Sequence, residues 1–358
     1  MCIVFLTQVV DADHPALAQS IDKIRALASR FERVTVICDR VGRHDLPPTV
    51  VLRTFGSPTR FGRGLRFERA LAEELLRRPR PDAVLAHMIP TFLLLAAPLA
   101  LLRRIPLLLW YTHWNADGSL RAATRLAAVV LSVDRRSFPL STPKLRATGH
   151  AIDVARFAPG GAECPGGRLR LLALGRTARW KGYDTMLEAL ELAVGRGLDA
   201  ELAIRGPQLT EDERAHRREL ERRIANSTAL RERVRIEPPL PRDELPALLH
   251  RTDALLSATQ PRGGATLDKV VYEASACGVP VIASNAALGE FLGGLQLELR
   301  FPERDAGRLA TTLVELEAAG PGIRRKVGAE LRRRVVSGHS VESWADAVAA
   351  AVSGLRRE

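Results

Sequence analysis

Three cations lie close together in the stretch LGRTARWKGYDTMLEALE, residues 174–191: Arg176, Arg179 and Lys181. The stretch begins at the end of an apolar run that predicts a buried strand, and from Asp184 onward it has the apolar spacing of an amphipathic helix. The free N–H groups at the start of a helix favour anions, and a guanidinium and an ammonium group beside them add positive charge. Arg176 and Lys181 therefore suit a phosphate or a diphosphate. The alternative is a basic loop in solvent.

A second stretch, PRGGATLDKVVYEASACGVPVIAS, residues 261–284, has a related pattern. Its paired glycines, the second of which is Gly264, permit a close approach of the backbone to a ligand. Thr266 is a good N-cap for a helix over residues 267–277. Glu273 is then expected about two turns inside this helix, where its carboxylate can accept hydrogen bonds from two hydroxyl groups, as in a ribose diol. The alternative for Glu273 is an ordinary exposed helix residue.

These residues depend on elements that the sequence arranges in a regular alternation of apolar runs and amphipathic segments. Such an alternation of strands and helices predicts a parallel, doubly wound α/β sheet, and it occurs twice. In the first half we expect strands at residues 2–9, 33–38, 49–55, 82–87, 105–111 and 128–134, and helices at 16–30, 63–78, 90–102 and 119–128. In the second half we expect strands at residues 168–175, 200–206, 233–238, 253–258 and 279–284, and helices at 182–195, 211–224, 242–250 and 267–277.

A Gly/Pro-rich stretch, GHAIDVARFAPGGAECPGG, separates the two series and reads as a linker. We therefore expect one domain over residues 1–160, a second over 161–340, and a C-terminal helix over 341–358 that can pack back on the first domain. Open parallel sheets bind ligands at the carboxyl ends of their strands, and two such domains placed face to face form a cleft. The turn with Arg176 and Lys181 follows directly after one such strand.

Composition narrows the classes of partner. The formal net charge is +12, mainly from arginines that alternate with glutamates along the expected helices, and aromatic residues make up only 5% of the chain. Few aromatics argue against a groove for single-stranded nucleic acid. The four cysteines have no metal-ligand spacing. No signal peptide is evident at the beginning of the chain, so a cytoplasmic protein is expected.

The most apolar tract, TFLLLAAPLALLRRIPLLLWY, residues 91–111, is divided by Arg103 and Arg104 and interrupted by prolines. Its pieces are too short to span a bilayer. They predict a buried helix followed by a buried strand. An apolar helix beside the basic segment RFGRGLRFERALAEELLRR leaves peripheral contact with an anionic membrane as an alternative.

Several segments together resemble glycosyltransferase family 4: GR…KGYD…LEAL, LDKVVYEASACGVPVIAS and GHAIDVARFAP. The resemblance extends from His14 through DAVLAHMIP and LLLWYTHW to the last helix. It implies the GT-B fold, in which two Rossmann-like, doubly wound domains face each other across a cleft. It also implies a retaining enzyme that transfers a sugar from a nucleoside diphosphate sugar to a hydroxyl group of a glycan or lipid-linked acceptor, as in the synthesis of cell-surface polysaccharides and glycolipids.

The resemblance assigns donor-binding roles in the second domain. Arg176 and Lys181 match the pair that neutralises the donor diphosphate as it leaves, and Glu273 matches the glutamate that holds the donor ribose. The loop before the helix matches the segment whose backbone N–H groups reach the distal phosphate, and in this chain Lys269 is expected as a further phosphate contact. The residues expected here are Gly264, Thr266, Leu267, Asp268 and Lys269.

In the first domain, His113 matches the histidine that meets the transferred sugar. Asp13 and His14, near the expected start of the first helix, and His87, at the end of a strand, are expected on the acceptor side. For each histidine taken alone, a structural role is the alternative.

One departure from the family pattern concerns the donor sugar. The family has a second glutamate eight positions before the ribose glutamate, and this chain has Ala265 there. Asp268 is a nearby acid. The resemblance implies no cofactor and no metal, because Arg176 and Lys181 neutralise the diphosphate. Two alternatives stay open: a non-catalytic nucleotide-sugar-binding protein, and another GT-B enzyme such as a sugar-nucleotide epimerase.

Overall fold

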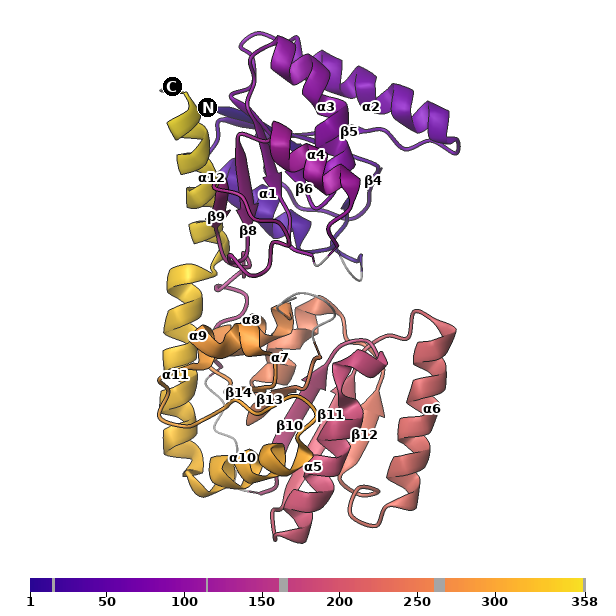
Figure 1. Cartoon of the computed structure of the whole chain (residues 1–358), viewed down its shortest axis with the longest axis vertical. Helices are drawn as coiled ribbons and strands as arrows, with labels where there is room; N and C mark the ends of the chain where they lie inside the picture. Colours follow the sequence, from indigo (N-terminus) through magenta and orange to yellow (C-terminus); the bar gives the residue numbers. More distant parts are fainter. Residues whose placement is uncertain (15–16, 114, 161–166, 261–267, 357–358) are drawn as a thin grey trace. The chain divides into compact units, whose positions relative to one another are not determined.

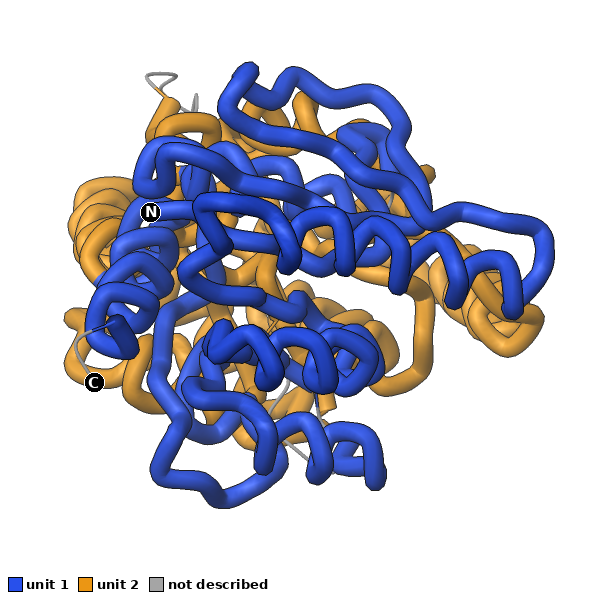
Figure 2. The backbone as a smooth tube through the Cα atoms, turned by 90° about the horizontal axis from the view of Figure 1, so that it is seen from above, with its two compact units in different colours: residues 1–153, 338–358 blue, residues 154–337 orange. Residues whose placement is uncertain are grey.

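The computed structural model describes residues 1–14, 17–113, 115–160, 167–260 and 268–356. The chain forms two compact units, which Figure 2 colours separately. Unit 1 comprises Met1–Asp153 and Gly338–Glu358, and unit 2 comprises Val154–Ser337. The chain therefore leaves unit 1 after its first part, builds unit 2, and returns to unit 1 at its end.

Unit 1 is built on a seven-stranded, wholly parallel sheet with the strand order β5-β3-β1-β6-β7-β8-β9. Figure 1 labels β5, β6, β8 and β9 of this sheet. A separate parallel pair joins β2 to β4. The strands are β1 (Cys2–Leu6), β2 (Val9–Val10), β3 (Arg33–Cys38), β4 (Arg40–Val41), β5 (Val50–Thr54), β6 (Ala83–His87), β7 (Leu107–Trp110), β8 (Val129–Ser132) and β9 (Leu145–Ala147).

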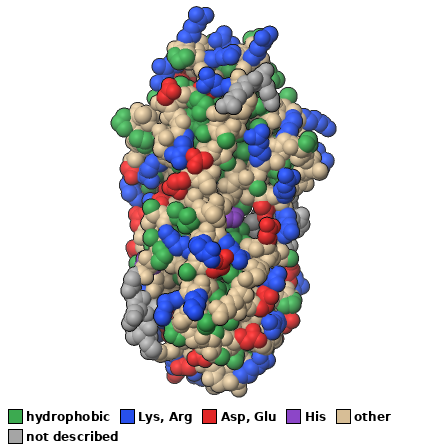
Figure 3. Space-filling model, turned by 90° about the vertical axis from the view of Figure 1, so that its left-hand side faces the viewer, with side chains coloured by type: hydrophobic (Ala, Val, Ile, Leu, Met, Phe, Trp, Pro, Cys, Tyr) green, Lys and Arg blue, Asp and Glu red, His purple; other side chains and the backbone are tan. Residues whose placement is uncertain are grey.

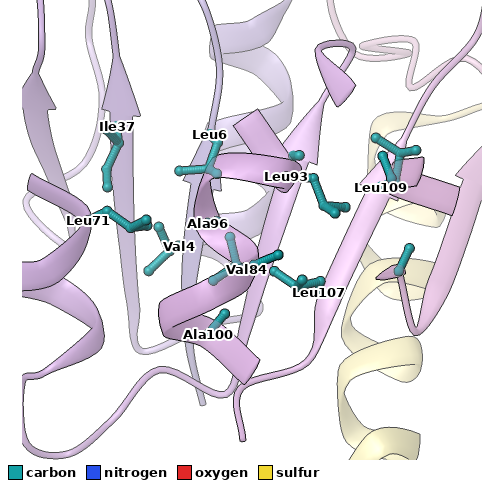
Figure 4. Close-up of a cluster of buried hydrophobic side chains, with 14 of the residues drawn as sticks. Val4, Leu6, Ile37, Leu71, Val84, Leu93, Ala96, Ala100, Leu107 and Leu109 are labelled. Atoms are coloured by element: carbon teal, nitrogen blue, oxygen red, sulfur yellow. The ribbon is translucent and has the colours of Figure 1, made fainter. Parts of the chain in front are cut away.

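Helices cover the sheet of unit 1, and its central strands are therefore apolar at nearly every position. One set of their side chains packs with α2, α3 and α4 in the cluster of Figure 4, which includes Val4, Leu6 and Leu109. Intervening residues such as His87 form contacts with α1 instead. The helices are α1 (Ser20–Ala28), α2 (Arg60–Leu75), α3 (Pro90–Leu102), α4 (Gly118–Leu126) and α12 (Val341–Leu355).

The last helix, α12, packs on α1 and so belongs to unit 1. The connection is fixed where the chain returns: Ile152 and Ser340 form a parallel bridge, and Ser340 caps α12 by accepting a hydrogen bond from the Ser343 amide at 3.1 Å. Trp344 in the first turn of α12 is fully buried. The C-terminal segment is thus an integral part of the core of unit 1.

Unit 2 is built on a five-stranded parallel sheet with the order β12-β11-β10-β13-β14. Its strands are β10 (Leu169–Leu174), β11 (Ala200–Arg205), β12 (Val234–Glu237), β13 (Ala254–Ser257) and β14 (Val281–Ala283). Its helices are α5 (Tyr183–Gly195), α6 (Glu211–Asn226), α7 (Leu245–Leu249), α8 (Lys269–Ala276), α9 (Gly289–Leu292), α10 (Ala306–Ala318) and α11 (Gly320–Gly338). Helix α5 packs against α10, and α8 lies on β13 and β14.

Most expected elements are present, but several boundaries differ: α2 spans residues 60–75 instead of 63–78, and the helix expected at 242–250 is a 3₁₀ turn followed by the short α7. The elements β9, α10 and α11 were not expected. The helix over 90–102 is found as expected, and the C-terminal helix begins at residue 341 as expected and ends at Leu355. In contrast, α1 begins at Ser20 instead of near residue 16. The segment before α1 is held by local bonds: the Leu17 amide donates to His14 Nδ1 at 3.0 Å, and such bonds compete with helix formation. Helix α8 begins at Lys269 instead of residue 267.

The distribution of charged side chains and the fold of the apolar tract agree with what the sequence predicts. On the face drawn in Figure 3, Lys and Arg side chains lie interspersed with Asp and Glu instead of in one patch. Within the described ranges of the chain, no helix combines the length and the apolar character needed to cross a membrane. The apolar tract at residues 91–111 forms α3 and β7, as its internal arginines predicted.

Candidate active site

The cation-bearing turn follows β10 directly and depends on two glycines. Gly175 has φ +143°, and a Cβ there would lie 2.9 Å from Cε of Lys181, so glycine leaves room for the lysine chain. Gly182 has φ +70°, and a Cβ there would lie 2.3 Å from the Ala258 carbonyl oxygen. The turn between them contains the short 3₁₀ helix Arg179–Lys181, and α5 begins immediately afterward.

Lys181 lies buried beside the start of α8. Its Nζ is 2.7 Å from Oδ1 of Asp268, the N-cap residue of that helix, and its side chain is only 10% exposed. The other oxygen of Asp268 accepts a hydrogen bond from Thr259 Oγ1. A buried ammonium group needs a counter-charge. Lys181 is tolerated there because a carboxylate neutralises it.

Arg176 and Arg179 bind carboxylates of α6. The guanidinium of Arg176 is 3.2 Å from the buried carboxylate of Glu213, and it lies 5.8 Å from the ring of Trp180. Arg179 is half exposed and pairs with Glu219 at 2.9 Å. The cations of the turn therefore lie at two places: Lys181 lies beside α8, and the two arginines lie beside α6.

Glu273 is buried instead of exposed. It is only 5% exposed and lies four residues after the start of α8, one turn inside the helix instead of the expected two. Its Oε1 is 3.3 Å from Nζ of Lys269 and 3.7 Å from Nη2 of Arg242. Two cations thus hold this carboxylate near the start of α8.

Part of the predicted donor loop lies outside the described residues: Gly264, Ala265, Thr266 and Leu267. Asp268, instead of the predicted Thr266, is the N-cap residue of α8, and its side chain caps no backbone N–H. Its carboxylate oxygens instead accept hydrogen bonds from Lys181 and Thr259. The structure therefore places Asp268, Lys269 and Glu273 at one end of α8, together with Lys181.

Glu213 and Arg242 contact predicted site residues but were missed in the sequence. Glu213 had a detectable signal, because Thr210 and Glu213 have the spacing of a capping box. The Glu213 amide donates to Thr210 Oγ1 at 3.2 Å, and its carboxylate accepts from the Leu209 amide at 2.6 Å. Arg242 gave no signal, since it reaches Glu273 from a separate 3₁₀ helix.

In unit 1, His113 follows β7 and is half-buried. Its Nδ1 accepts a hydrogen bond from the Asn115 amide at 3.1 Å. Asp13 is exposed and forms a two-fold hydrogen bond with Arg43, which lowers the pKa of this carboxyl group. Asp13 and His14 precede α1 by several residues and are not at its start, because α1 begins at Ser20.

His87 lies buried at the end of β6, where it is only 3% exposed. Its Nδ1 is 3.3 Å from Oγ1 of Thr7, and its Nε2 is 3.1 Å from Nζ of Lys23. The lysine is buried as well, with its ammonium 3.4 Å above the ring centre of Trp110 and 5.6 Å from that of Trp344. This geometry favours the structural role that was the alternative for His87.

Burial and the neighbouring Lys23 charge hold the pKa of His87 well below its ordinary value near 6.5. The unfolded chain therefore binds a proton that the folded chain does not, and stability falls as the pH drops below 6.5. We expect the His87 contribution to lower the free energy of unfolding by about 1.4 kcal/mol as the pH falls from 7.5 to 5.5. Urea unfolding at both pH values measures this against His87→Gln, whose pH dependence should be weaker by that amount. Equal dependence in the two proteins would contradict the assignment.

The cation turn lies within a segment of the chain that matches a known protein family. Residues 168–318 match the family described as glycosyl transferases group 1. D-inositol 3-phosphate glycosyltransferase of Thermobifida fusca is 30% identical over 225 residues, which are 56% of this chain and 47% of that protein. D-inositol 3-phosphate glycosyltransferase 1 of Catenulispora acidiphila is 31% identical over 170 residues, 42% of this chain and 36% of that protein. The chain thus matches less than half the length of either relative.

Similar solved structures cover nearly the whole chain. HepE of Anabaena in complex with UDP has a TM-score of 0.77 at 17% identity and matches 99% of this chain and 100% of that one. A glycosyltransferase of Rickettsia africae has a TM-score of 0.75 at 16% identity and matches 99% of each chain. The expected fold class is confirmed: the chain has the two Rossmann-like parallel sheets of the GT-B fold, and its residues 168–318 match the group 1 glycosyltransferases.

Proposed function

We propose that this chain is a glycosyltransferase that moves a sugar from a nucleoside diphosphate sugar to a hydroxyl group of a glycan or lipid-linked acceptor. One observation carries the proposal. The segment that matches the group 1 glycosyltransferases holds a buried lysine, Lys181, beside the start of α8. A nucleotide as the ligand is in keeping with the HepE structure, which was solved with UDP.

Lys181 and Arg176 are the proposed diphosphate ligands. Each is paired with a carboxylate, Lys181 with Asp268 and Arg176 with Glu213. A diphosphate therefore competes with these carboxylates or shares the cations with them. Because Lys181 is buried, solvent screens its charge little, and it can stabilise negative charge that grows on the leaving diphosphate.

Glu273 is the proposed ribose ligand. Its carboxylate can accept hydrogen bonds from two neighbouring hydroxyl groups, and Lys269 and Arg242 fix its position. In unit 1, we propose that His113 contacts the transferred sugar and that Asp13 and His14 lie on the acceptor side.

In the proposed reaction, the bond between the anomeric carbon and the diphosphate oxygen breaks, and a bond from that carbon to the acceptor oxygen forms. The acceptor attacks from the face that the diphosphate leaves, so the anomeric configuration is retained. The acceptor proton passes to an oxygen of the leaving phosphate. Arg176 and Lys181 supply the positive charge in this proposal, so the transfer requires no metal.

A panel of labelled UDP-, GDP- and ADP-sugars tests the proposal. We expect transfer to an acceptor, or slow hydrolysis without one, for at least one donor. Binding without turnover would favour a non-catalytic binding protein. Turnover without an acceptor product would favour an epimerase. No binding and no turnover with any donor would refute the proposal.

We further propose that α2 contacts an anionic membrane carrying the acceptor. Phe61 and Leu65 lie one turn apart and are 83% and 63% exposed. The exposed arginines of the same helix are Arg60, Arg63, Arg66 and Arg69. Apolar side chains flanked by cations are typical of helices that lie on anionic lipid.

Co-sedimentation with vesicles of anionic and of neutral lipid tests this surface. Phe61→Asp should abolish binding to anionic vesicles, because it places a negative charge among the apolar contacts. Leu209→Asp, at a position of unit 2 that is 58% exposed, is the matched control and should still bind. Sedimentation of Phe61→Asp as complete as that of the unmodified protein would exclude α2 as the contact.

A further inference from the structure

Helix α6 supports the cation turn from one side through several contacts. Besides the Arg176–Glu213 pair, Thr177 Oγ1 donates to the Glu213 carbonyl oxygen at 3.1 Å. Arg179 pairs with Glu219 one further turn along α6. The position of the turn, and with it that of Arg176 and Lys181, therefore depends on its attachment to α6.

His216 lies at the centre of this attachment. Its side chain is fully buried. Its Nδ1 is 2.8 Å from the Thr177 carbonyl oxygen, in the turn, and its Nε2 is 2.9 Å from Oδ2 of Asp184, in the first turn of α5. One imidazole ring thus joins α6 to the residues on both sides of Lys181.

Both partners of this ring only accept hydrogen bonds. A carbonyl oxygen has no proton to give, and neither has an ionised carboxylate. A neutral imidazole has a single N–H and satisfies only one of the two oxygens, whereas an imidazolium satisfies both. We propose that His216 is an imidazolium that positions the turn, so that its proton is required for full binding of the donor diphosphate. This inference rests on the proposed function, which makes the turn a diphosphate site.

The surrounding charges support a cation at this place. Asp184 on α5 is the carboxylate bonded to His216, and Glu213 and Glu219 lie three residues before and after His216 on α6. The cations nearby are Arg179, which pairs with Glu219 and Asp212, and Arg223, which donates to the Asp184 backbone oxygen. The ionised Asp184 offsets the cost of burying the imidazolium.

Loss of the proton breaks one of the two bonds. If the bond to Asp184 is lost, only Arg223 of these contacts still joins α6 to α5, and if the bond to the Thr177 carbonyl is lost, the attachment of the turn to α6 is weakened. In both cases Lys181 and Arg176 lose part of their fixed geometry. His216 is therefore a positioning residue that makes donor binding depend on pH.

The first test needs no nucleotide. The ring nitrogens of His216 are followed by NMR as a function of pH in the full-length protein, with His216→Gln to assign the signals. We expect a doubly protonated ring at pH 6 and a lower midpoint in Asp184→Asn, which keeps an acceptor oxygen but removes the charge. A ring that is neutral at pH 6 would overturn the proposal, whatever the function of the protein.

The second test measures donor binding by calorimetry across the His216 midpoint, with UDP-glucose, GDP-mannose and ADP-glucose as probes. The diphosphate of these sugars keeps its charge over this range, so its own titration does not interfere. Affinity should fall about tenfold as His216 loses its proton, the effect expected for one charge-assisted hydrogen bond. His216→Gln should bind weakly at every pH. In Asp184→Asn the fall should move to lower pH.

The control is His44→Gln, which removes an exposed histidine of unit 1 and should keep the full pH response. An equal pH response in His216→Gln and the unmodified protein would overturn the positioning role. If none of the three probes binds, the proposed function fails, while the NMR titration still decides whether His216 carries the proton.

Discussion

Replacement of Lys181 by alanine should lower the rate of sugar transfer by about 10²–10³-fold, the usual effect of removing one preorganised charge from a transition state. The ammonium group is buried and lies beside the start of α8, where the N–H groups of the helix add to its field. Negative charge on the leaving diphosphate grows as the glycosidic bond breaks. The loss should therefore appear mainly in kcat for the best donor of the panel.

The variant also leaves Asp268 without its cation, which lowers stability as well. The double variant Lys181→Ala with Asp268→Asn removes both charges, so it should regain thermal stability without regaining transfer. Lys326→Ala, at an exposed lysine on α11, is the matched control and should keep full activity. A Lys181→Ala protein that is folded and has an unchanged rate would remove Lys181 from the mechanism.

Replacement of Trp344 by alanine should lower the unfolding free energy of unit 1 by about 3–5 kcal/mol, the range found for buried aromatic residues. Trp344 is fully buried on α12, and its ring lies 5.6 Å from the Lys23 ammonium. The substitution opens a cavity and removes part of the aromatic surroundings that accommodate a buried charge. Urea unfolding of the variant measures the change.

Phe61→Ala is the matched control, because this aromatic side chain is 83% exposed and its loss opens no cavity. It should change the unfolding free energy by less than about 0.5 kcal/mol. A loss below about 1 kcal/mol for Trp344→Ala would show that α12 contributes little to the stability of unit 1.

The sequence predicted the elements well wherever local signals agreed. Pro90 marked the start of α3, and the apolar face of α12 marked the start of that helix at Val341. The starts of α1 and α8 were less predictable, because side chains there bind other groups. His14 Nδ1 accepts a hydrogen bond from the Leu17 amide. The carboxylate of Asp268 accepts hydrogen bonds from Lys181 and Thr259 instead of capping α8.

The candidate site was predictable by residue type but not by pairing. The spacing of Arg176, Lys181 and Glu273 suggested anion and diol binding, and the structure brings Lys181 to the start of α8. The partners of these residues come from distant segments, as with Lys181 and Asp268, which are 87 residues apart. Such ion pairs, and the burial of His87 beside Lys23, depend on tertiary packing that no local pattern encodes.

The placement of α12 in unit 1 has a consequence for biosynthesis. Since Met1–Asp153 and Gly338–Glu358 form one unit, a ribosome makes all of Val154–Ser337 before it makes the helix that carries Trp344. The first part of unit 1 is therefore complete long before the helix that finishes its core has been made. Until then the first part of unit 1 lacks α12, and the apolar surface beside Lys23 that α12 covers is exposed. Chaperones that bind exposed apolar surface are expected to act in this period.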